Sequence, residues 1–377
     1  MLHSAGATRR LLVLSLAIAR GVLGQSCNGF NITSDESAEA ARRCPDINGD
    51  VMIFPDNVTE VSLDGVENIN GSLIMYIGCD TRTNENCIQR HWLQSVSSAT
   101  LKTVNGSIDI GQNDNISTIS FPKLTSVERG VRLELDYLEH LDITSLETVG
   151  TLNLRAPRLA TMEHEHLRNA TGGFISIGAT SLESVDSFIR SPMDLIRLKI
   201  DNSLKLKQIT LGISSALEVY IAGKFGWHSD SGEIIEDGES DIAKLILGGP
   251  ETTEMRITTL TILNSTAAIE RAPGLMTLEV GTLRLEGNYF MEHLALPFDK
   301  LKAAYLKGAP ALKWLSNIPQ AVDWDSFYSL SIKDMPALNL SSEYMIDGKG
   351  DLVRSWYWPR SGMGEIDLSA SMTNHFL

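Results

Sequence analysis

The chain has 377 residues, a formal net charge of −15 at pH 7 and an isoelectric point near 5.0. This acidic balance argues against a protein that binds polyanions, so nucleic acid is not an expected partner. Hydrophobic residues make up 43% of the chain but aromatic residues only 6%, which indicates a core of aliphatic side chains.

Residues 1–24 have the pattern of a secretory signal peptide. Arg9 and Arg10 precede the apolar run LLVLSLAIA, and modest side chains at 22–24 come before the expected cleavage at Gln25. The apolar run is too short to span a bilayer. Cleavage would remove these two arginines and Arg20, which changes the formal charge from −15 to −18. We therefore expect a secreted chain.

Four cysteines lie in the N-terminal quarter of the chain, at Cys27, Cys44, Cys79 and Cys87. An even number in an oxidising compartment predicts two disulfides. Of the three connectivities that four cysteines allow, we favour Cys27–Cys44 with Cys79–Cys87, because each bond then closes a short loop. No CxxC pair or neighbouring pair of histidines accompanies them, so we expect no metal at these residues.

The segment SDESAEAARRC, between the first two cysteines, predicts a short amphipathic helix. Ser34 or Asp35 is a suitable N-cap, and acidic residues follow in the first turn. An uncovered end of a stacked β-structure would expose strand edges and core. We therefore expect this helix to cover the N-terminal end of the fold.

An aliphatic frame then repeats along the chain with a step of about 22 residues. It is clearest at Leu124, Val127 and Leu133, which recur as Leu146, Val149 and Leu154. Segments such as VRLEL and TLNL alternate apolar and polar residues, the signature of a short strand with one buried face. Strands this short bury that face only by stacking on one another, so the period predicts a solenoid.

The repeats predict an all-β, right-handed parallel β-helix of about a dozen turns, each of about 22 to 25 residues. The longer step from Ile69 to Val104 predicts that a loop with the second cysteine pair is inserted between turns. A leucine-rich repeat with one helix per turn is the rival fold. The spacers favour strands and turns, because they contain Pro, Gly, Asn and β-branched residues.

The repeat frame divides the mature chain into four segments. We expect a first solenoid half with a disulfide cap at 25–225 and an acidic loop at 226–241. A second solenoid half is expected at 242–345, and a C-terminal cap or tail at 346–377, where the repeat is lost. The acidic run from Asp230 to Asp241 lacks the spacing of an EF-hand loop, so a solvated loop is favoured over a calcium site.

A few residues suggest chemistry, but each has a simpler interpretation. His164 and His166 are spaced for a shared strand face, yet no third metal ligand is identifiable, so we interpret them as polar surface residues. Four aromatic residues near the last turns suggest a platform for stacking sugars, although packing in the core of these turns is favoured. They are Tyr305, Trp314, Trp324 and Tyr328.

The sequence contains no nucleophile elbow or phosphate-binding loop, and we predict neither catalytic residues nor a cofactor. A carbohydrate-active β-helix enzyme remains the alternative, and it would need carboxylates gathered in one groove. Acids such as Glu134, Asp136, Glu139 and Asp142 instead occupy positions expected to face solvent. A receptor-like ectodomain that binds a ligand is the third hypothesis.

Eight Asn-x-Ser/Thr sequons predict a heavily glycosylated protein, because sequons become glycosylated in secreted chains where they lie on the surface. The asparagines are Asn31, Asn57, Asn70, Asn105, Asn115, Asn169, Asn264 and Asn339.

The order of these features resembles the fungal cell-wall organisation proteins, which are GPI-anchored surface glycoproteins built on receptor-L-domain-like β-helices. The residues that carry the resemblance are Cys27 and Cys44 followed by PDINGDVMI (Pro45–Ile53), VSLDGVENINGSL (Val61–Leu73), LKTVNGSIDI (Leu101–Ile110) and ISFPKLTSV (Ile119–Val127). The resemblance implies a non-catalytic role in wall integrity at the cell surface, with wall polysaccharide or surface proteins as partners. It also implies a Ser/Thr-rich stalk and a GPI signal, neither of which is seen before Leu377, and no membrane span is predicted.

Overall fold

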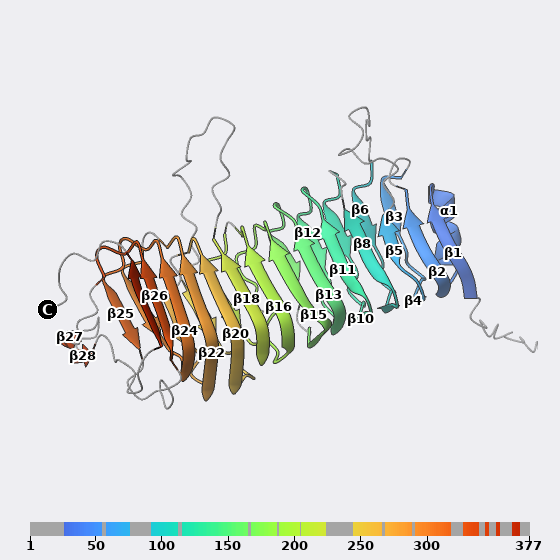
Figure 1. The fold of residues 1–377 in the computed structure, drawn as a ribbon. Coiled ribbons are helices and arrows are strands. Elements are labelled where there is room, and N and C mark those ends of the chain that lie inside the picture. The colour runs from blue at the N-terminus through green and yellow to red at the C-terminus, as the bar shows by residue number, and fades with distance from the viewer. Residues whose placement is uncertain are drawn as a thin grey trace, which may run out of the picture.

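The computed structural model describes residues 26–54, 58–75, 92–111, 115–164, 167–186, 188–203, 205–223, 244–265, 268–288, 291–317, 327–338, 344–346, 352–354 and 364–369. Almost all of the elements are strands, which stack in parallel as a β-solenoid of about 11 turns. Figure 1 shows the resulting elongated column. The predicted all-β solenoid is therefore confirmed, and the leucine-rich repeat is wrong because the described residues contain a single short helix, α1 (Asp35–Arg42).

One side of the solenoid is a 17-stranded sheet, called the long sheet below. Its strands are β1 (Ser26–Ile32), β2 (Asp46–Ile53), β4 (Asn68–Ile69), β5 (Leu73–Met75), β7 (Thr103–Val104), β8 (Ser107–Gly111), β10 (Ser126–Val127), β11 (Gly130–Glu134), β13 (Thr148–Arg155), β15 (Asn169–Gly178), β16 (Asp194–Asp201), β18 (Ser215–Ala222), β20 (Glu254–Leu263), β22 (Thr277–Glu286), β24 (Lys300–Lys307), β26 (Ser329–Lys333) and β29 (Glu365–Ser369).

Shorter parallel sheets contain the remaining strands of the turns. They are β3 (Glu60–Ser62), β6 (Ser95–Ser97), β9 (Thr118–Ser120), β12 (His140–Asp142) and β14 (Thr161–Glu163); then β17 (Gln208–Leu211), β19 (Lys244–Leu247) and β21 (Ala268–Arg271); then β23 (His293–Leu296) and β25 (Trp314–Asn317). An antiparallel pair, β27 (Tyr344–Ile346) with β28 (Leu352–Arg354), lies towards the C-terminal end.

The core consists of aliphatic ladders. In each turn of the solenoid, called a rung below, a buried aliphatic side chain lies next to the side chain that is paired with it in the neighbouring turn. Val131 pairs with Ile108 on one side and Leu152 on the other, and all three side chains are buried. Burying a side chain of this size contributes about 1.5–3 kcal/mol relative to leaving it exposed. Ile69 pairs directly with Val104, so the longer step predicted between these residues is confirmed.

Helix α1 covers the N-terminal end of the column, as Figure 1 shows. Ser34 is the N-cap and forms a reciprocal capping box with Ser37, while Ala38 and Ala41 are buried. A disulfide joins Cys27 to Cys44, with 5.9 Å between their Cα atoms, which confirms the first predicted pair. Cys79 and Cys87 lie outside the described residues.

The chain bends at two places in each rung. The first bend, called the glycine corner, lies between consecutive strands of the long sheet such as β7 and β8, where a Cβ at Gly106 would lie 2.6 Å from the carbonyl oxygen of Gly71 in the neighbouring rung. The second bend follows the long strands; it is left-handed after β15, β16, β20, β22, β24 and β26, and we call it the left-handed corner. Its residues have φ between 47° and 71°, and they are Ala179, Asn202, Asn264, Gly287, Gly308 and Asp334.

The long sheet continues across the two predicted solenoid halves. Val219 of β18 pairs with Leu260 of β20, and β29 pairs with β26, so Ile366 aligns with Leu330. The repeat therefore reappears in the C-terminal segment, where the sequence pattern predicts its loss. The acidic segment 226–241 lies outside the described residues. Among the residues that are described, no helix has the length and hydrophobicity needed to cross a membrane.

Candidate functional site

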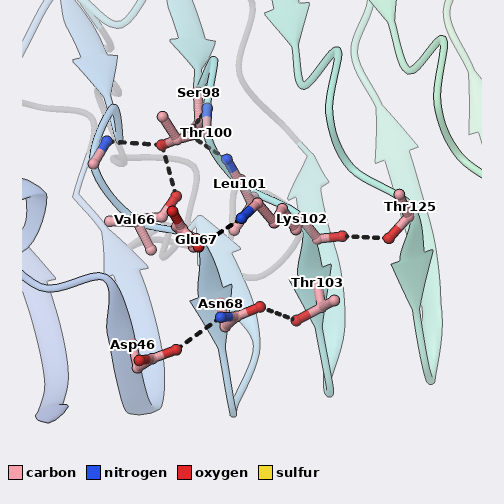
Figure 2. Close-up of polar contacts among 11 residues, drawn as sticks. Asp46, Val66, Glu67, Asn68, Ser98, Thr100, Leu101, Lys102, Thr103 and Thr125 are labelled. Atoms are coloured by element: carbon pink, nitrogen blue, oxygen red, sulfur yellow. Dashed lines mark hydrogen bonds and ion pairs between the residues drawn. The ribbon is translucent and has the colours of Figure 1, made fainter. Parts of the chain in front are cut away.

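Polar side chains form ladders along the N-terminal half of the long sheet, as Figure 2 shows. The Nδ2 atom of Asn68 donates to Oδ1 of Asp46 over 2.7 Å, and Oγ1 of Thr103 donates to Oδ1 of Asn68 over 2.7 Å. Beside them, Nζ of Lys102 lies 2.6 Å from a carboxylate oxygen of Glu67. Each of these contacts joins one rung to the next.

A serine and a threonine satisfy the backbone at the neighbouring corner of Figure 2. Oγ1 of Thr100 accepts from the amide of Gly65 over 2.7 Å and donates to the carbonyl of Val66 over 2.8 Å. Oγ of Ser98 donates to the carbonyl of Leu63 and accepts from the amide of Leu101. Buried backbone groups need such partners. The hydroxyls at this corner therefore have a structural role rather than that of a nucleophile.

A second ladder consists of asparagines, two of which belong to sequons. Nδ2 of Asn70 donates to Oδ1 of Asn48 over 2.7 Å, and Nδ2 of Asn105 donates to Oδ1 of Asn70 over 3.0 Å. A side-chain amide carries two N–H donors, and the ladder uses one of them. Asn70 and Asn105 are exposed, so the second N–H of each side-chain amide is accessible to solvent.

The other sequon asparagines occupy several positions on the solenoid. Asn31, Asn115 and Asn169 are exposed. Asn264 is half-buried at the left-handed corner, where its backbone amide donates to the carbonyl of Glu286 over 2.9 Å. Asn57 and Asn339 lie outside the described residues. Glycan attachment at any of the eight asparagines stays a prediction.

The outward surface of the long sheet changes character from β16 to β26, and we call this part the tyrosine face. Two columns of residues run across its strands, one residue per rung. The residues of the second column pair directly from strand to strand, and those of the first column lie next to such paired residues. Tyr305 and Tyr328 are exposed, by 38% and 53%, and Leu217 by 59%. The first column is Ile196, Leu217, Thr258, Gly281, Lys302 and Tyr328; the second is Lys199, Tyr220, Thr261, Arg284, Tyr305 and Ser331.

Basic groups lie near both tyrosines of the second column. Nζ of Lys199 is 5.8 Å from the ring centre of Tyr220, and the guanidinium of Arg284 is 5.4 Å from that of Tyr305, distances at which a cation is attracted to the ring face. Burial raises the pKa of Tyr220 above its ordinary value of 10.0. Lys199 opposes that increase in the pKa, while Asp201 and Glu218 add to it.

Ion pairs between neighbouring rungs balance charge on and around the tyrosine face. Nε of Arg197 lies 2.6 Å from Glu218, and Nζ of Lys307 lies 2.9 Å from Glu286. Most of these groups are substantially exposed, so each pair contributes only about 0–1 kcal/mol to stability. Their main consequence is that these cations and carboxylates neutralise one another within the face.

The aromatic residues singled out by the sequence do not pack as predicted. Tyr305 and Tyr328 are exposed rather than buried in the core of the last turns. Each lies between two buried neighbours in the chain and so points outward, Tyr305 on β24 and Tyr328 just before β26. Trp314 is half-buried on β25 of a short sheet, and it pairs there with His293. Trp324 lies outside the described residues. The apolar neighbours of Tyr305, Ala304 and Leu306, are the sequence signal that indicates its exposure, because alternate residues of a strand face opposite sides.

His164 is also placed differently from the prediction. It is buried rather than on the surface, with Nε2 3.3 Å from the carbonyl oxygen of Leu146 and its ring edge-on to Phe188 at 4.6 Å between centroids. His166 lies outside the described residues. Within the described part of the chain, no three His, Cys, Asp or Glu side chains gather in a way that would hold a metal ion.

A shallow depression of about 330 Å³ lies at the left-handed corner between β22, β24 and β26. It is lined by Glu286, Gly287, Lys307, Gly308, Pro310 and Asp334. The Glu286 carboxylate and the Lys307 ammonium are already paired. Elsewhere on the surface, burial lowers the pKa of His293, whose Nε2 lies 3.1 Å from Oγ of Ser316.

Comparison with known proteins gives one informative relative. No protein-family signature matches the chain, and no solved structure is detectably similar to it. Over 218 residues it is 22% identical to the cell wall protein ecm33 of Schizosaccharomyces pombe, which covers 56% of this chain and 43% of that protein. The chain therefore spans less than half the length of that relative. The chain is a distant homologue of ecm33, consistent with a fungal family of cell-wall proteins.

Proposed function

We propose that the chain is a secreted, non-catalytic surface glycoprotein that supports the organisation and integrity of a fungal cell wall. The similarity to a cell wall protein, which extends over 56% of the chain, is the observation that carries this proposal. The fold supports it, because a solenoid braced between rungs by ladders such as Asp46–Asn68–Thr103 is a stiff column suited to presenting a long surface.

The arrangement of charges supports a structural role over a catalytic one. Glu279 lies between Arg256 and Lys300, at 3.6 Å and 3.1 Å, and Glu286 pairs with Lys307. Carboxylates held this way are engaged with neighbouring cations, whereas a glycosidase needs two carboxyl groups that face one substrate. The exposed sequon asparagines, among them Asn31 and Asn169, support the glycoprotein part of the proposal.

The proposal is tested by deleting the gene in its fungal host and restoring it as the full chain. We expect the deletion strain to become more sensitive to dyes that bind wall polysaccharide, and the full chain to restore resistance. Digestion of the secreted protein with an N-glycosidase is expected to increase its gel mobility. Unchanged dye sensitivity in the deletion strain would overturn the proposal. Release of oligosaccharides from purified wall polymers by the protein would favour the enzyme hypothesis instead.

A further inference from the structure

We propose that the tyrosine face binds a neutral polysaccharide chain that lies across the strands from β18 to β24. This inference rests on the proposed function, because it names the ligand class through which the chain would act in a wall. The face presents a floor of small residues on β20 and β22, between two raised ends on β18 and β24. The floor consists of Thr258, Thr259, Gly281 and Thr282, which are exposed or half-buried. In the second column, the buried Thr261 and the exposed Arg284 lie between Tyr220 and Tyr305.

The raised ends carry side chains suited to the apolar faces of sugar rings. Leu217 and Tyr220 stand on β18, and Tyr305 stands on β24 with Tyr328 on the next rung. Neighbouring strands are spaced by about 4.8 Å, so Tyr220 and Tyr305 are separated by three spacings, or about 14 Å. This distance accommodates several pyranose rings, which would stack on the tyrosines at each end and offer hydroxyls to Arg284 and to the threonines of the floor.

The charge distribution favours a neutral ligand. The chain as a whole has a formal charge of −15, which repels polyanions. On the face itself, Arg197 is paired with Glu218, and Lys307 with Glu286. Lys199 is paired with Asp201 as well as lying near the ring of Tyr220, and Arg284 lies near the ring of Tyr305. A surface that is balanced in this way exerts little net field on a charged polymer, so stacking and hydroxyl contacts determine which ligand binds.

The positions of the sequons leave the face accessible. Within the described residues, no sequon asparagine lies in either of the two columns; Asn264 belongs to the left-handed corner beyond β20, and Asn70 and Asn105 lie in the N-terminal half. A glycan at these asparagines would therefore not be attached to the floor or to its raised ends.

The test is co-sedimentation of the full, secreted and glycosylated chain with insoluble particles of linear β-1,3-glucan. We expect the wild-type chain to bind, and the double variant Tyr220→Ala/Tyr305→Ala to bind about tenfold more weakly. Tyr220→Phe/Tyr305→Phe should keep most of the binding, because the ring faces remain. Added salt should change little, because paired charges do not drive the interaction.

The matched control is Tyr137→Ala. Tyr137 is 40% exposed and lies 3.9 Å from the guanidinium of Arg158, yet it is outside the tyrosine face. It should bind the particles as the wild type does. Equal loss in Tyr137→Ala and in the double variant, or undiminished binding by a double variant with an unchanged melting temperature, would overturn the inference.

The inference and the proposed function fail in different ways. If the wild-type chain restores dye resistance to the deletion strain but sediments with no neutral glucan, the inference is wrong and the proposed function stands. If the wild-type chain sediments with the particles but does not restore dye resistance, the proposed function is wrong and the inference that the tyrosine face binds polysaccharide remains.

Discussion

The N-terminal half of the long sheet, from β2 to β13, and its C-terminal half, from β15 to β26, hold their rungs together with different chemistry. From β2 to β10, neighbouring rungs are joined mainly by amides and hydroxyls, as in Asp46–Asn68–Thr103 and Asn48–Asn70–Asn105, with the ion pair of Lys102 and Glu67 beside them. From β16 to β26, the joining groups are mainly ion pairs and rings, such as Arg197 with Glu218 and Arg284 near Tyr305.

The corners differ as well. In the C-terminal half the corner residues are left-handed and pass amide hydrogen bonds to the next rung; the amide of Gly287 donates to Lys307 and that of Gly308 donates to Lys333. In the N-terminal half the matching position is a buried aliphatic residue, Leu135, whose amide still donates to the carbonyl of Arg155. The amide hydrogen bond to the next rung is therefore present in both halves, although the backbone conformation of its donor differs. The spacing of the rungs is the same, but the side chains and backbone conformations that stabilise it differ.

The largest expected effect is at the glycine corner of the N-terminal half. In Gly106→Ala the new methyl group would lie 2.6 Å from the carbonyl oxygen of Gly71, so two rungs must separate. We expect a loss of about 3 kcal/mol in the free energy of unfolding, at the upper end of overpacking substitutions. Urea denaturation measures it. The sequon at Asn105 is kept. Gly274→Ala is the matched control, because a Cβ there meets nothing within 4 Å; equal losses would contradict the explanation.

The next largest effect on the free energy of unfolding is expected in the amide ladder. Asn68→Ala removes hydrogen bonds to both Asp46 and Thr103, and we expect it to cost about 1–2 kcal/mol. Thr103→Val removes only one of these bonds and should cost about half as much. Denaturation midpoints of both variants check the order. A larger loss for Thr103→Val than for Asn68→Ala would mean that the ladder does not carry the stabilisation.

At the left-handed corner we expect a substitution to raise the free energy of unfolding rather than lower it. Ala179 has φ of 48°, which is unfavourable for a residue with a Cβ, so Ala179→Gly should stabilise the chain by about 1 kcal/mol. Ala216→Gly is the comparison within a strand of the same half, where glycine should destabilise by about 0.5–1 kcal/mol or more. Melting temperatures that fall in both variants would show that the corner conformation does not govern the result.

The smallest effect is expected for the ion pairs of the C-terminal half. Arg197→Ala breaks the contact with Glu218, but the arginine side chain is 54% exposed, so a loss of about 0.5 kcal/mol is expected, decreasing further in high salt. Stability measured at low and high salt tests this. A loss as large as that of Asn68→Ala would remove the distinction between the two halves.

The repeat fold was predictable because its signal is carried by many residues at once. The pairing of Ile69 with Val104, the cap at Ser34 and the disulfide from Cys27 all follow from spacing and local chemistry. β29 was not predicted, because one rung with Ile366 and Leu368 has no neighbouring repeat to reveal its period. The left-handed corner was missed too, because Ala179 gives no indication of a positive φ.

The candidate surface was harder to predict than the fold. For Tyr305 and Tyr328 the sequence suggested a sugar-stacking platform, but capping and core packing were favoured, although the buried neighbours of each residue place it on the outside. The two columns of the tyrosine face combine residues from rungs between Ile196 and Ser331. Their proximity depends on the register between strands, which a single sequence does not provide.

The direct pairing of Ile69 with Val104 also has a practical consequence for engineering. The rungs before and after this 35-residue step stay in register through their own main-chain hydrogen bonds, such as that from the amide of Asn105 to the carbonyl of Ile69. Lengthening a connection between two fixed ends carries only a logarithmic entropic penalty. An insertion between Met75 and Trp92 is therefore expected to leave the pairing of the rungs on either side intact.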